Sequence, residues 1–193
     1  EAIDLAKDDI LNYVEVDNQY SSEDFIIVVF HAGLGQDISS SGGFDPTIYD
    51  IHSAYIEETM LYNAFNDSEI MLNDNISISN GIVLPETLNM IYYDIIEDIV
   101  PITFIGSDDL ENLYCDIQLG MTGLFAYLLG YRLGFPPMHS TDNIFPYTRI
   151  GKFGLMDQGS NNGRGLIPAP PHVWSRIDNQ HIQESFVDKT DDI

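Results

Sequence analysis

The chain has 193 residues, of which 44% are hydrophobic, so it is long enough to bury the core of one domain. Seven Lys and Arg residues against 31 Asp and Glu residues give a net charge of −24. This excludes nucleic acid as a ligand and disfavours anionic membranes, because both are bound through Lys and Arg. No apolar run approaches the roughly 18 residues of a membrane span. The single cysteine, Cys115, excludes an internal disulfide and is interpreted as a buried structural thiol.

The first half of the chain predicts two helices and several strands. Residues 2–11 place their apolar side chains near helical spacing. Residues 25–30, FIIVVF, form a β-branched and aromatic run that is typical of a strand covered on both faces. The glycine-containing HAGLGQD that follows predicts a turn. Residues 53–65 are expected to be helical, and residues 76–87 to form a strand, a turn and a second strand.

The second half predicts one glycine-containing helix followed by loops. Apolar residues recur at helical spacing over about 116–133. Gly120, Gly123 and Gly130 would each cost an isolated helix roughly 1 kcal/mol relative to alanine. We therefore expect this helix to be buried and to pack closely against another element. GFPP ends it, and repeated Gly and Pro predict loops over 134–171.

Charge is distributed unevenly along the chain. Residues 1–131 contain 24 Asp and Glu residues and a single base, Lys7, whereas residues 132–176 contain five bases and two acids. One interpretation is a solvated acidic surface suited to salty or extracellular water. The alternative is that some carboxylates bind calcium, which takes clustered oxygen ligands, although no stretch has the spacing of a known calcium loop.

Common catalytic motifs are absent from the sequence. No two histidines stand at i, i+3 or i, i+4, which excludes a zinc site with two histidines on one helix. A metal site assembled from distant parts of the chain would use His31, His139, Asp142 or His172. No G-x-S-x-G motif marks a serine nucleophile. HAGLGQD lacks the third glycine, the Lys and the Ser/Thr of a phosphate-binding loop.

Two stretches together resemble the immune-inhibitor-A family of secreted bacterial zinc metallopeptidases. GLFAYLLGYRLGFPPMHST, which begins at Gly123, is similar to the family's helix H-E-x-G-H-x-L-G-L-P-D, which supplies the zinc ligands and the catalytic glutamate. IGKFGLMDQGSNNGRGLIPAPPHVWSRI, which begins at Ile150, resembles the segment around the methionine turn beneath the metal. FIIVVFHAGLGQD and NGIVLPET resemble strands of the same domain. The resemblance covers about residues 25–176.

The zinc-binding positions of this resemblance carry other residues. The first His ligand falls on Tyr127, the catalytic Glu on Leu128, the second His on Tyr131 and the third ligand on Pro137, while Met156 keeps the methionine. Leucine cannot accept a proton and proline has no side-chain ligand. Tyrosine ligates a metal only as a phenolate, which its pKa near 10 disfavours. The resemblance therefore implies a domain without zinc and without catalytic residues.

The fold expected from the resemblance is an α/β (α+β) zincin-like domain. A twisted mixed sheet would lie over the central helix at about 116–133, followed by a loop-rich C-terminal part with the methionine turn at Met156. The whole chain, 1–193, is expected to be a single peptidase-like domain. Because it begins at Glu1 without Met, we expect it to be a mature product or a piece of a longer secreted protein.

Three functions are compatible with these features. The leading hypothesis is a catalytically inactive pseudo-peptidase domain that serves as an extracellular binding or structural module. Its partners would be a protein or peptide ligand, which can add to a sheet edge through backbone hydrogen bonds, or other domains of its parent chain. The first alternative is a secreted hydrolase with a rebuilt metal site. The second is a component of a surface assembly whose acidic loops are stabilised by calcium.

Overall fold

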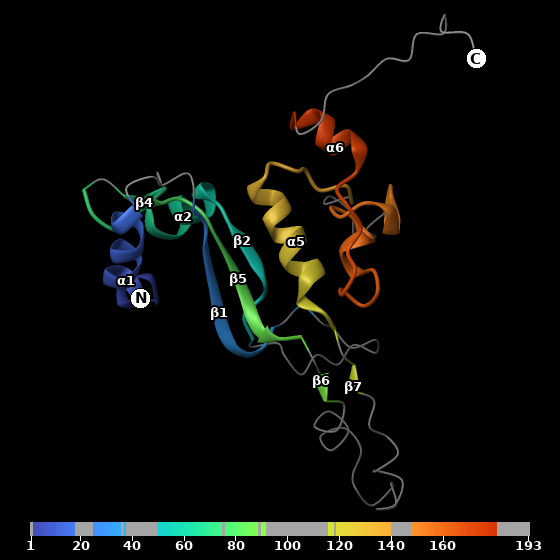
Figure 1. Cartoon of the computed structure of the whole chain (residues 1–193), viewed down its shortest axis with the longest axis horizontal. Helices are drawn as coiled ribbons and strands as arrows, with labels where there is room; N and C mark the ends of the chain where they lie inside the picture. Colours follow the sequence, from blue (N-terminus) through green and yellow to red (C-terminus); the bar gives the residue numbers. More distant parts are fainter. Residues whose placement is uncertain are drawn as a thin grey trace, which may run out of the picture. The chain divides into compact units, whose positions relative to one another are not determined.

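The computed structural model (Figure 1) describes residues 2–17, 25–35, 37, 50–74, 76–88, 90–91, 116–117, 119–139 and 148–180. The chain divides into two compact units, Glu1–Asp116 and Ile117–Ile193. Helices and a mixed sheet together confirm the α+β class. That the whole chain forms one peptidase-like domain stays a prediction. Within these ranges, no helix has both the length and the apolar character needed to cross a membrane.

The first unit is built on a three-stranded mixed sheet in the order β1-β5-β2. Strand β5 (Gly81–Thr87) is central and pairs in parallel with β1 (Ile27–Leu34), with Ile27 opposite Gly81. Strand β2 (Ala54–Ile56) runs antiparallel on the other side of β5. The predicted strands at 25–30 and 76–87 are confirmed by β1, β4 and β5. The expected burial of 25–30 on both faces is wrong, because residues 25–29 are half-buried and Phe30 is 61% exposed.

Two helices, a small hairpin and a short strand complete this unit. They are α1 (Ala2–Asp17), α2 (Glu58–Phe65), the paired β3 (Ile70–Met71) and β4 (Ser77–Ile78), and β6 (Met90–Ile91). The predicted helix at 2–11 is confirmed and continues to Asp17. The core consists of side chains that are at most 7% exposed, among them Leu61, Leu72, Ile78, Ile82 and Leu84.

Two predictions in this unit need correction. The stretch HAGLGQD is not a turn from its first residue, because β1 continues through His31 to Leu34. The strand is irregular there, and Gly33 has a φ of +82° that favours glycine. The predicted helix at 53–65 begins only at Glu58, since Ala54–Ile56 forms β2. Pairing with the central strand β5 decides the conformation of this segment.

The second unit contains one long helix and a loop-rich segment. Helix α5 (Met121–Arg132) is followed by the single-turn 3-10 helices η2 (Gly151–Phe153) and η3 (Gln158–Asn161), and by the short helix α6 (Val173–Asp178). The prediction of a loop-rich C-terminal part is confirmed for the described residues 148–172. In Figure 1, α5 lies beside the loops that follow it in the sequence.

The predicted boundary of the central helix, at about residue 116, is wrong. Residues Asp116–Ile117 form the short strand β7, and α5 begins after Gly120. The N–H of Gly120 donates to the carbonyl of Arg164 at 2.8 Å, and that of Gly123 to Gly165 at 2.8 Å. The loop at 164–165 thus accepts the first N–H groups, which sets the start of the helix by a contact distant in the sequence.

Candidate functional site

The candidate site is centred on Met156, which lies directly beneath α5. Met156 is fully buried and forms a cluster with Phe135 and Leu155. Tyr127 and Tyr131 of α5 pack against this cluster. The carbonyl of Met156 also accepts the N–H of Met138 at 2.9 Å, and Met138 itself packs against the cluster. The segment that follows α5 is therefore joined at the site to the loop that contains Met156, which we call the methionine loop.

Glycines on α5 allow this close approach. Gly123 and Gly130 are both buried. A Cβ atom at Gly130 would overlap the sulfur of Met156, and one at Gly123 would overlap the carbonyl oxygen of Ser160. The expectation that these glycines pack against another element is confirmed. That element is the loop around the predicted methionine turn.

Two tyrosines of the helix hydrogen-bond to each other above the buried methionine. The hydroxyls of Tyr127 and Tyr131 are 2.6 Å apart, and either can be the donor. Their rings meet edge to face, with centroids 5.1 Å apart and an interplanar angle of 87°. This geometry is favourable for aromatic pairs. The ring of His139 lies near Tyr127, at a centroid distance of 6.4 Å and a tilt of 32°.

The environment of Tyr127 opposes its ionisation. Burial raises the pKa of its phenol well above the ordinary range, and the hydrogen bond with Tyr131 raises this pKa further. The proximity of Tyr131 and of Asp157 acts in the same direction, since a negative charge disfavours a second one. At neutral pH the Tyr127 hydroxyl is therefore neutral.

Asp157, the residue after Met156, holds the preceding loop in place. Its side chain is 6% exposed, and Oδ2 accepts backbone N–H groups from Arg149, Ile150 and Gly151 at 3.0, 2.9 and 2.8 Å. Oδ1 is also buried and has no hydrogen-bond partner among the described residues. Sequence reasoning missed this residue. The available signal was an acid directly after the methionine, in a segment that otherwise carries mostly bases.

The predicted zinc-site positions do not form a set of metal ligands. The structure brings Tyr127 and Tyr131 together beside Met156. Leu128 is 4% exposed and has no donor atom in its side chain, and Pro137 is exposed. A zinc ion bound to tyrosine requires a phenolate, whereas burial raises the pKa of Tyr127 and disfavours that form. The zinc that the family resemblance would imply does not fit these residues.

The histidines proposed for a rebuilt metal site lie in three different segments of the chain. His31 lies in β1, where its Nδ1 is 3.1 Å from the carbonyl of Ala32. His139 forms an isolated β-bridge with Thr148. His172 precedes α6, and its Nδ1 accepts the N–H of Trp174 at 3.3 Å.

Asp142, the fourth candidate ligand, lies outside the described residues, as does Cys115. Among the residues that the structure describes, no three His, Cys, Asp or Glu side chains are grouped closely enough to hold a metal ion.

Comparison of the chain with protein-family models, curated proteins and solved structures finds no match.

Proposed function

We propose that this chain is a catalytically inactive zincin-like domain, related to the immune-inhibitor-A peptidases, that acts as an extracellular binding or structural module. The observation that carries the proposal is the hydrogen bond of 2.6 Å between Tyr127 and Tyr131 next to the buried Met156. These two tyrosines stand where the family has its histidine ligands. Their hydroxyls bond to each other, and their rings pack beside the cluster that contains Met156.

The chemistry of these side chains supports loss of the peptidase reaction. A zinc peptidase needs three protein ligands, a metal-bound water and a carboxylate that takes its proton. Leu128 offers no proton acceptor at the position of the glutamate. The raised pKa of Tyr127 keeps this phenol protonated at neutral pH, so it supplies no phenolate as a metal ligand or a base. The carboxylate of Asp157 is held by the loop at 149–151, whose three N–H groups donate to its Oδ2.

The packing of the helix supports the proposed relationship. Gly130 admits the sulfur of Met156, and Gly123 admits the backbone of Ser160. Gly130 stands at the position of the glycine in the family's H-E-x-G-H motif, and its contact with Met156 joins the two stretches that carry the resemblance. The active-site scaffold is thus retained at positions that pack, while the positions that would bind metal are changed.

The sheet offers a binding mode for a peptide. Strand β1 has β5 on one side and pairs with no other strand among the described residues. Phe30, in the middle of β1, is 61% exposed. An extended peptide can add to such an edge through backbone hydrogen bonds and cover the exposed ring.

Restoring the family's motif tests the proposed relationship and the loss of reaction together. The variant Tyr127→His/Leu128→Glu/Tyr131→His/Pro137→Asp should bind zinc in a chelator-sensitive manner, because a zincin-like backbone would bring these four positions together. The matched control is Tyr127→Phe/Leu128→Met/Tyr131→Phe, which adds no ligand. Metal analysis by mass spectrometry and cleavage of a peptide library are measured on all three proteins. Stoichiometric zinc in the unmodified chain, with cleavage abolished by a chelator, would overturn the proposal.

A further inference from the structure

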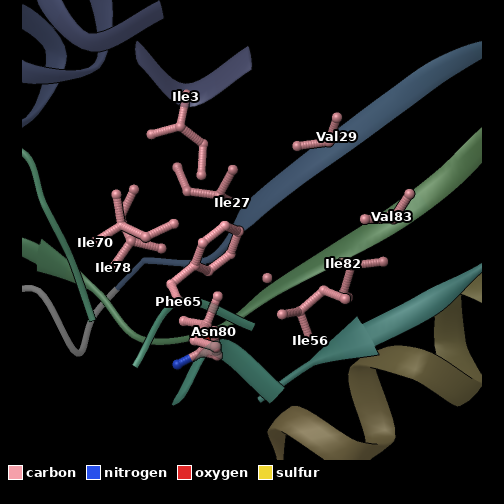
Figure 2. A pocket seen from close by; sticks show the side chains of 12 residues that line it. Ile3, Ile27, Val29, Ile56, Phe65, Ile70, Ile78, Asn80, Ile82 and Val83 are labelled. Atoms are coloured by element: carbon pink, nitrogen blue, oxygen red, sulfur yellow. The ribbon is translucent and has the colours of Figure 1, made fainter. Parts of the chain in front are cut away.

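The first unit contains a cavity that none of the features above uses. Its volume is about 260 Å³. Ten of its twelve lining residues are Ile, Val, Leu or Phe, and the other two are Asn80 and Gly81. Figure 2 shows side chains from α1, α2 and the strands surrounding this hollow, with Ile3 on one side and Ile82 and Ile56 on the other.

The pleat of the sheet explains which residues of β1 line the cavity. Ile27 and Val29 of β1 line it, whereas Val28, between them, does not. Alternate residues of a strand point to one face, so one face of β1 forms part of the wall. On β5, Gly81 stands opposite Ile27 and contributes no side chain. A Cβ atom at this position would lie 3.2 Å from the carbonyl oxygen of Ile27, so the glycine permits the close pairing of the two strands.

Part of the cavity wall is accessible to solvent. Ile27, Val29, Ile56 and Val83 are half-buried although they belong to the sheet of this small unit. The ring of Phe65, which also lines the cavity, is 71% exposed. The cavity is therefore reached from solvent, and an apolar group that enters it would cover surface that water now contacts.

Charge restricts which apolar ligand can approach. The unit Glu1–Asp116 contains 24 Asp and Glu residues and one base, Lys7. The exposed carboxylates of Asp67 and Glu69 lie in the sequence between Phe65 and Ile70, two residues of the wall. The resulting negative potential raises the local concentration of cations and lowers that of anions.

We propose that this cavity binds the hydrocarbon part of a small cationic amphiphile, whose amine is attracted by the net negative charge of this unit. An apolar cavity of about 150 Å³ holds benzene, which has six carbon atoms, so a cavity of this size holds a group of about ten heavy atoms. The apolar wall selects the hydrocarbon, and the negative potential of the unit selects a positive head group over a negative one. This site goes beyond the proposed function and does not depend on whether the domain is a former peptidase.

The charge preference is tested on the full chain with three ligands that each contain eight carbon atoms. Calorimetric titrations at pH 7 with octylamine, 1-octanol and octanoate should rank the affinities in that order, and propylamine should show no saturable binding. At low ionic strength we expect octylamine to bind roughly tenfold more tightly than octanol, because of the local potential. Added salt should reduce that difference and leave the affinity for octanol almost unchanged.

The location of the site is tested with two variants of one strand. Val29→Phe places a larger side chain in the wall and should weaken octanol binding at least tenfold. Val28→Phe makes the same change on the opposite face of β1 and should leave the affinity within about twofold, as for an independent site. Circular dichroism checks that both variants fold. Tighter binding of octanoate than of octanol, equal effects of the two variants, or no saturable binding of octylamine by the unmodified chain would each overturn the proposal.

Discussion

Replacing Gly130 by alanine tests whether the methionine loop packs directly against α5. The new methyl group would overlap the sulfur of Met156, whose side chain is fully buried. Overpacking of this kind costs typically 1–3 kcal/mol. Alanine in place of glycine within a helix returns about 1 kcal/mol. The net loss in the free energy of unfolding should therefore be about 0–2 kcal/mol.

A double-mutant cycle isolates the contact from the helix propensity. Met156→Ala alone should cost about 2–5 kcal/mol, because it leaves a cavity in a closed cluster. In the double variant Gly130→Ala/Met156→Ala, the added methyl group occupies part of that cavity and no longer meets the sulfur. The double variant should thus be more stable than the sum of the single changes predicts, by about 1–3 kcal/mol.

Urea unfolding monitored by tryptophan fluorescence measures these differences. The chain has one tryptophan, Trp174, which lies in α6 of the second unit, so the signal reports this unit. Thr122→Ala, at an exposed position of the same helix, is the control for a general effect of alanine. Effects of Gly130→Ala and Met156→Ala that add within about 0.5 kcal/mol would refute the direct contact.

Three further outcomes follow from the site. Asp157→Ala should reduce the unfolding free energy by about 2–4 kcal/mol in urea titrations, because it removes the acceptor of three N–H groups at 149–151. Asp157→Asn, which keeps one oxygen, should lose less. Tyr131→Phe should cost about 1 kcal/mol, since it takes away the partner of the Tyr127 hydroxyl. In an absorbance titration Tyr127 should stay protonated when exposed tyrosines ionise, because its folded pKa is raised. The stability that this raised pKa provides is complete below the unfolded pKa near 10 and declines above it. Tyr127→Phe should lessen that decline in thermal melts, and an unchanged decline would contradict the assignment.

Short-range patterns in the sequence predicted the elements whose environment they define themselves. The run at 25–30 contributes to a strand because β-branched and aromatic residues suit the pleated surface of a sheet. Gly123 and Gly130 indicated close packing of the helix, since their cost in an isolated helix implied a compensating contact. The tyrosine pair was visible as an i, i+4 spacing, which places both hydroxyls on one side of the helix.

Other elements depend on partners that lie far away in the sequence. Ala54–Ile56 is too short for its period to be recognised, and pairing with β5 makes it a strand instead of the first turn of a helix. The start of α5 depends on carbonyl groups at 164–165. Asp157 resembled any other acid, because its three donors belong to backbone N–H groups whose position the local sequence does not indicate.

On the proposed ancestry, the two tyrosines explain how the helix can persist without a metal. Removing zinc and histidines from a zincin would leave a cavity above the methionine, and a metal site contributes directly to folding. Tyr127 and Tyr131 pack their rings on the cluster that contains Met156, and they bond their hydroxyls to each other. A single reversion to histidine would assemble no ligand set, because the other three positions would still lack metal ligands. On the proposed ancestry, a metal site would therefore be regained only through several substitutions together.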